Sequence, residues 1–61
     1  MKFVKFITLK YNQEVEIKAS SIVAFEEISE DTTGIYLETS HYVIVKETYQ
    51  SVANSIHRAL E

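Results

Sequence analysis

The chain has 61 residues, of which 46% are apolar and 25% charged, with no cysteine, no proline and one glycine. Six cations and nine acids give a formal net charge of −3. This composition excludes a disulfide-stapled domain and a thiolate zinc site, and two histidines are too few for a histidine-rich metal cage. We expect one domain, residues 1–61, whose single core buries only about 60% of the unfolded surface. Self-association is the remaining way to stabilise so small a core, so we expect a homodimer or a higher oligomer.

The apolar fraction and seven aromatic residues argue against a disordered chain. No apolar run approaches the roughly 20 residues of a spanning helix, and Lys5 interrupts the apolar residues near the N-terminus. We therefore expect no secretory signal and no membrane insertion. The lack of cysteine is compatible with a reducing cytosol, and we expect a cytoplasmic protein.

Two-residue periodicity predicts five strands, at about 2–9, 13–18, 22–28, 34–38 and 41–45. The first has apolar side chains on both faces, so it is expected to be covered on both sides or to serve an interface. Asn12 is the expected turn residue after it, and Gly34 is expected to supply a positive φ or a bulge at the end of a polar turn over 29–34. Because short connections favour antiparallel pairing, the predicted fold is α+β: one small five-stranded antiparallel meander, as a twisted sheet or partial barrel, with a C-terminal helix.

The helix is predicted at about 48–60, where apolar residues recur at helical spacing. Thr48 stands just before the first of them, as an N-cap residue should. The apolar stripe consists of Tyr49, Val52, Ala53, Ile56, Ala59 and Leu60. A helix of about 12 residues is marginal alone, so it must pack on the sheet or on a partner's helix.

No group of side chains has the spacing of a catalytic or metal site. There is no G-x-S-x-G motif, and a single glycine cannot build a phosphate loop. Ser40 and His41 are neighbours on an extended segment and point to opposite faces, as do Glu26 and Glu27, for which we expect solvent on one face and a lysine partner on the other. His57 is expected at the surface or at an interface. We therefore predict that the chain is not an enzyme and has no catalytic residue, cofactor or metal.

Charge and aromatic residues favour a protein partner. Residues 19–45 contain five acids and no cation, while residues 1–18 carry +2. Nucleic-acid binding needs clustered cations, and Arg58 is the only arginine, so we do not expect a nucleic-acid partner. Aromatic residues here favour core and interface packing over base stacking. The interface candidates are Phe3, Phe6, Tyr42, Tyr49, Val52, Ile56 and Leu60; some of them must be core, and the sequence does not separate the two sets.

The chain resembles the FlbD family (also called SwrD) of short bacterial flagella-associated proteins. Its residues 17–27 match the spacing of that family's Leu-Asn-x-x-x-Ile-x-x-Ile-Glu-Glu run, and residues 42–48 resemble its Tyr-Val-Val-Lys-Glu-Ser segment. Further similarities lie at Thr8, Leu9, residues 35–37, Val52 and Ile56. Tyr11 stands where the family has its hairpin glycine. The resemblance implies a non-enzymatic cytoplasmic protein that supports the flagellar motor through protein contacts, and it transfers no catalytic residues.

Two other functions stay open. One is a phage-type small protein that binds or inhibits a host protein, since short phage proteins share this pattern. The other is a small RNA-binding regulator similar to the CsrA type, which also has five strands and a C-terminal helix in an intertwined dimer. CsrA-type proteins read RNA with arginine and glycine-rich edges, and this chain has one residue of each kind.

Overall fold

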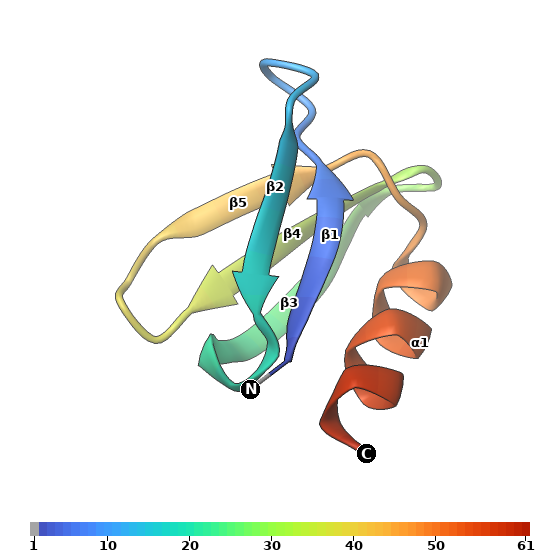
Figure 1. Cartoon of the computed structure of the whole chain (residues 1–61). Coiled ribbons are helices and arrows are strands. Elements are labelled where there is room, and N and C mark those ends of the chain that lie inside the picture. The colour runs from blue at the N-terminus through green and yellow to red at the C-terminus, as the bar shows by residue number, and fades with distance from the viewer. Residues whose placement is uncertain (1) are drawn as a thin grey trace.

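The computed structural model describes residues 2–61 and shows an α+β fold with two antiparallel sheets and one C-terminal helix (Figure 1). The elements are β1 (Phe3–Ile7), β2 (Glu14–Lys18), the 3₁₀ turn η1 (Ala19–Ser21), β3 (Ile22–Ser29), β4 (Thr32–Leu37), β5 (Tyr42–Val45) and α1 (Tyr49–Leu60). The β1–β2 sheet lies across the β3–β4–β5 sheet, and α1 runs alongside. Within the described residues, no helix is long and apolar enough to cross a membrane.

The expected single five-stranded meander is wrong, because β2 and β3 do not pair. The connector between them, expected to be a plain link, forms η1 instead. Ala19 of η1 is buried, and the backbone N–H of Glu38 donates to the carbonyl of Ser21 at 2.8 Å. These contacts direct the chain into a second sheet instead of a third hairpin strand.

The two sheets meet where β1 ends. Thr8 forms an isolated antiparallel bridge with Val45. On either side of it, Leu9 N–H donates to the carbonyl of Ile44 at 2.9 Å and Lys46 N–H donates to the carbonyl of Ile7 at 2.8 Å. The expectation of a partial barrel is thus met only at this one corner, where β1 and β5 run side by side for a few residues.

The core lies between the two sheets and α1. Alternation decides which side chains enter it: Val4 and Phe6 of β1 are buried, while Phe3, Lys5 and Ile7 face outward. The expectation that β1 is covered on both faces is therefore wrong within this chain. The other buried apolar residues are Ile17, Ala19, Ile35, Val45, Val52, Ala53 and Ile56.

The helix begins as the sequence predicts. The Thr48 side chain accepts a hydrogen bond from the backbone N–H of Ser51 at 3.1 Å, which satisfies one of the free amides of the first turn. The helix buries Val52 and Ile56, and the Tyr49 ring packs on Phe25 of β3 with ring centroids 5.2 Å apart. Its partner is therefore this chain's own sheet.

The turns differ in part from the prediction. Asn12 has φ 53° and turns the first hairpin as expected. The second turn is tighter than predicted, because β3 extends to Ser29 and β4 begins at Thr32. Gly34 therefore lies inside β4, and its φ is not positive. The structure assigns it a different role, in making room for Tyr42.

Candidate protein-binding site at the edge of strand β5

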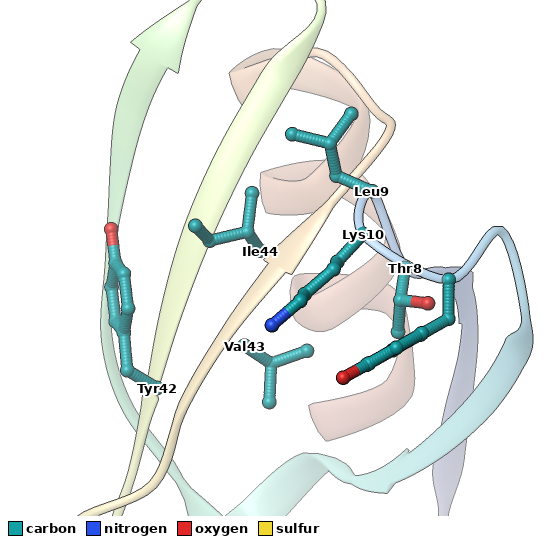
Figure 2. A pocket seen from close by; sticks show the side chains of 7 residues that line it. Thr8, Leu9, Lys10, Tyr42, Val43 and Ile44 are labelled. Atoms are coloured by element: carbon teal, nitrogen blue, oxygen red, sulfur yellow. The ribbon is translucent and has the colours of Figure 1, made fainter.

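An apolar hollow of about 270 Å³ lies between the β1–β2 loop and β5. Its lining is mainly apolar and consists of Thr8, Leu9, Lys10, Tyr11, Tyr42, Val43 and Ile44. Leu9 is 47% exposed and Tyr11 is 66% exposed, which leaves large apolar surfaces in water. Figure 2 shows the Lys10 side chain extending from the loop towards Val43 and Ile44 of β5.

The strand beside the hollow has an open edge. Leu37 N–H of the β4 strand donates to the carbonyl of His41, and along an antiparallel pair hydrogen-bonded and non-hydrogen-bonded residue pairs alternate. The backbone N–H and C=O groups of Val43 and Val45 therefore point towards β4. The backbone groups of Tyr42 and Ile44 therefore point away from β4. The N–H of Leu9 donates to the carbonyl of Ile44. The N–H of Ile44 and the N–H and C=O of Tyr42 have no backbone hydrogen-bond partner within residues 2–61. The hollow is thus bordered by unpaired strand backbone.

The loop that forms the other wall is held by local hydrogen bonds. Thr8 N–H donates to the carbonyl of Gln13 at 2.8 Å, and Asn12 N–H donates to the carbonyl of Thr8 at 3.0 Å. The Lys46 ammonium donates to the Asn12 side-chain oxygen at 3.0 Å and ties the loop to the residue after β5. The left-handed Asn12 makes this turn without a glycine. Both walls of the hollow are therefore fixed by the fold.

A cluster of two tyrosines and a glutamate covers the outer face of the β3–β4–β5 sheet. The hydroxyls of Tyr42 and Tyr36 both donate to Oε2 of Glu26, at 2.8 and 3.3 Å. The two rings pack with centroids 4.6 Å apart. The Tyr42 ring lies over Gly34, where any Cβ would collide with its hydroxyl and ring. The close approach of the Tyr42 ring to the backbone in this position therefore depends on a glycine at position 34.

The negative charge of Glu26 affects both hydroxyls. The hydrogen bond to Glu26 raises the pKa of Tyr42 to about 12, with smaller contributions from desolvation and from the charge itself. The charge of Glu26 likewise raises the pKa of Tyr36 above its ordinary value. Both tyrosines are therefore neutral donors at physiological pH, and Glu26 does not have the lysine partner that the sequence analysis expected.

The structure separates the seven interface candidates into two sets. Phe6, Val52 and Ile56 are core residues of this chain and are not available to a partner. Phe3, Tyr42, Tyr49 and Leu60 are exposed. Of these four, only Tyr42 lines the apolar hollow, and the other three lie on β1 and at the two ends of α1.

The two histidines considered for chemistry lie on different parts of the fold, His41 just before β5 and His57 in α1. The ring nitrogen Nδ1 of His41 lies 2.8 Å from the hydroxyl of Thr39, and its neighbour Ser40 has φ 74°. His57 lies in the last turn of α1. Residues 2–61 contain no group of three or more histidine, cysteine, aspartate or glutamate side chains that could hold a metal ion.

A second, shallower hollow lies between β1 and α1. Three cations border it, Lys2, Lys5 and Arg58, together with Phe3, Val4, Ser55 and Ala59. Lys2 and Lys5 are close in sequence, but Arg58 reaches them only through the packing of the helix. This cluster of cations was not predicted from the sequence.

Leu9, Tyr11, Val43 and Ile44 line the apolar hollow but are absent from the sequence-based interface candidates. A signal for Tyr11 was present, because the turn expected after the first strand keeps Tyr11 among polar residues that would suffice for a turn. The Glu26 cluster had no such signal, since Tyr36, Tyr42 and Glu26 lie on three different strands. Comparisons with protein-family models, with curated proteins and with solved structures found no match to this chain.

Proposed function

We propose that this chain is a non-enzymatic protein-binding module that takes up an extended segment of a partner along the free edge of β5. The observation that carries the proposal is the unpaired backbone of Tyr42, together with the unpaired N–H of Ile44, beside the apolar hollow. Strand addition uses such an edge for main-chain hydrogen bonds and a neighbouring pocket for a side chain. The partner segment would place one apolar side chain between Leu9, Tyr11 and Val43.

The physical case rests on what the exposed surface would otherwise cost. An unpaired strand edge is a template for pairing, and proteins usually cover or charge it. The end of β1 covers the β5 edge at Val45 and at the carbonyl of Ile44. Within residues 2–61 the edge at Tyr42 carries neither protection, and residues 42–45 are the uncharged run Tyr-Val-Ile-Val. Lys10 is the one charged residue in the lining, and its ammonium lies 5.3 Å from the centroid of the Tyr11 ring. From there it would reach a carbonyl or carboxylate of the bound segment.

The biological setting is part of the same proposal. The resemblance to the FlbD family supports a cytoplasmic role in which the partner belongs to the flagellar motor. Genes for motor proteins beside this gene would support that setting, whereas a phage module would favour the role of a phage protein that binds a host protein. Homodimerisation also remains a proposal, supported by the exposure of Phe3, Tyr49 and Leu60. Sedimentation at micromolar concentration tests it, and a folded 7.0 kDa monomer would contradict it.

Strand addition can be tested with a peptide library displayed on phage. We expect selected peptides to share an apolar residue and to bind Tyr11→Ser roughly tenfold more weakly than the wild type, because one large apolar contact is lost. Val23→Ser is the matched control, since Val23 is equally exposed but lies on β3 outside the hollow. N-methylation of the peptide amides that face β5 should abolish binding, while N-methylation of the alternate amides should not. No enrichment over an unrelated protein, or equal loss in both serine variants, would refute the proposal.

One observation favours RNA binding as a second candidate function: Lys2, Lys5 and Arg58 converge on the hollow between β1 and α1. Such a cluster attracts phosphate groups, and its binding falls steeply with salt. A mobility-shift assay with a single-stranded RNA at two salt concentrations tests this candidate. A shift that is lost in a Lys5→Gln/Arg58→Gln variant would support it over the protein-binding module.

A further inference from the structure

We propose that the cluster of Glu26, Tyr36 and Tyr42 is a second recognition site, which binds an arginine or lysine side chain of the partner protein. The site lies on the outer face of the β3–β4–β5 sheet, and only Tyr42 is shared with the apolar hollow. The inference rests on the proposed function and adds to it the charge of the partner.

Only one of the two carboxylate oxygens of Glu26 accepts hydrogen bonds from the described residues. Both tyrosine hydroxyls donate to Oε2, and within residues 2–61 no hydrogen bond is formed to Oε1. A carboxylate can accept about four hydrogen bonds, so the two donors leave capacity for a cationic donor. Two hydroxyl donors on one oxygen restrain the position of this acceptor before any partner arrives.

The surroundings of Glu26 favour a cation. The strands β3, β4 and β5 contain no lysine and no arginine, so nothing within this sheet neutralises Glu26. The wider stretch of residues 19–45 holds five acids and no cation. Tyr36 is 42% exposed and Tyr42 is 41% exposed. Tyrosine rings attract ammonium and guanidinium groups, and a carboxylate beside them adds a charge-assisted hydrogen bond.

The sequence also removes the side chain that would block this arrangement. Gly34 lies between Glu26 on β3 and Ile44 on β5 in the strand register, and Tyr42 leans across it to reach Glu26. Any larger residue at this position would displace the Tyr42 ring. The one glycine of the chain therefore stands where the cluster needs it. A partner with a basic residue near its bound segment fits both sites.

The test is an NMR titration of the isotope-labelled protein with N-acetyl-arginine amide and with N-acetyl-citrulline amide, its neutral isostere. We expect saturable shifts at Glu26, Tyr36 and Tyr42 with the arginine compound at millimolar concentration. The citrulline compound should bind roughly tenfold more weakly, because it offers neither the charge-assisted hydrogen bond nor the cation–π contact. Glu26→Gln should lose the preference for arginine. Glu27→Gln changes the net charge equally at the next residue of β3 and should keep it.

Equal binding of the two compounds, or an equal effect of the two glutamine variants, would overturn the site. A Tyr36→Leu variant that binds arginine as the wild type does would also overturn it, since that change removes a ring and a hydroxyl. The failure of the proposed function looks different. If the selected peptides bind Glu26→Gln as well as the wild type and bind Tyr11→Ser roughly tenfold more weakly, strand addition stands and only the cation site falls. If the arginine compound binds but no peptide does, the cation site stands and strand addition falls.

Discussion

The two faces of the β3–β4–β5 sheet are built from the same strands but are stabilised differently. On the inner face, Thr33, Ile35 and Val45 are completely buried against the helix and the other sheet. On the outer face, Tyr36 and Tyr42 stay exposed and are held by hydrogen bonds to Glu26. The inner face therefore contributes stability by removing apolar area from water, whereas the outer face gains little from burial.

Strand β1 shows the same contrast between a buried and an exposed face, here with two phenylalanines. Phe6 is 2% exposed and Phe3 is 53% exposed, although both belong to the same five-residue strand. Alternation assigns Phe3 and Phe6 to opposite faces of the strand, and packing against α1 decides which face becomes core. Side chains on the outer faces, such as Phe3, thereby stay exposed.

The largest expected effect breaks the inner face at β1. Phe6→Ala should lower the free energy of unfolding by about 3–5 kcal/mol, because it removes a buried ring and leaves a cavity. Since a chain of this length has only roughly 3–9 kcal/mol in total, the variant should be largely unfolded in a urea or thermal denaturation experiment. Phe6→Leu, with a milder loss of roughly 1–2 kcal/mol, keeps the effect measurable.

Phe3→Ala is the matched control for that change. Exposed residues outside special features usually change stability by about 0.5 kcal/mol or less. If Phe3→Ala destabilises the chain as much as Phe6→Leu does, then Phe3 is buried in solution. That outcome would point to a second copy of the chain on the outer face of β1 and would support the proposed homodimer.

The second-largest expected effect concerns a polar residue on the otherwise apolar inner face. Thr33 is polar yet completely buried, and its hydroxyl donates to the backbone carbonyl of Glu47 at 2.8 Å. Thr33→Val keeps the shape but removes this donor, so we expect a loss of about 1–3 kcal/mol despite the gain in hydrophobicity. Thr39→Val removes an exposed hydroxyl and should be nearly silent. Equal denaturation midpoints for the two variants would show that burial alone stabilises this face.

Much of the inner face could be predicted from the sequence, and much of the outer face could not. Periodicity placed the helix and its Thr48 cap, because these depend on residues within one turn of each other. The pairing of β1 with β5 was missed, since it joins Thr8 to Val45 across most of the chain. The Glu26 cluster was missed for the same reason. Gly34 was assigned to a turn because a lone glycine usually marks one, whereas here it makes room for a side chain from another strand.

Gly34→Ala should move the Tyr42 ring on the outer face with little change in the free energy of unfolding. The new methyl group would collide with the Tyr42 ring, which is exposed and can swing outward. Replacing a strand glycine also stabilises the chain through the unfolded state, by about 0.4–1 kcal/mol. We therefore expect a net change in unfolding free energy below roughly 1 kcal/mol but a loss of the arginine preference. A loss of several kcal/mol would show that the Tyr42 ring is a structural element.

The smallest expected effect is a change in tyrosine ionisation. The hydrogen bond to Glu26 raises the pKa of Tyr42 to about 12, so the folded chain holds this proton more tightly than the unfolded chain does. Its contribution to stability is therefore complete below the ordinary tyrosine pKa of about 10 and disappears as the pH rises towards 12.

Glu26→Gln removes the charge and should lower the pKa of Tyr42 and Tyr36 together, which an ultraviolet absorbance titration of the tyrosines detects. Glu27→Gln, with the same change in net charge, should leave that titration unchanged, because Glu27 contributes to neither shift. If both variants titrate as the wild type does, the outer-face hydroxyls are not bonded to Glu26 in solution, and the cation site loses its fixed acceptor.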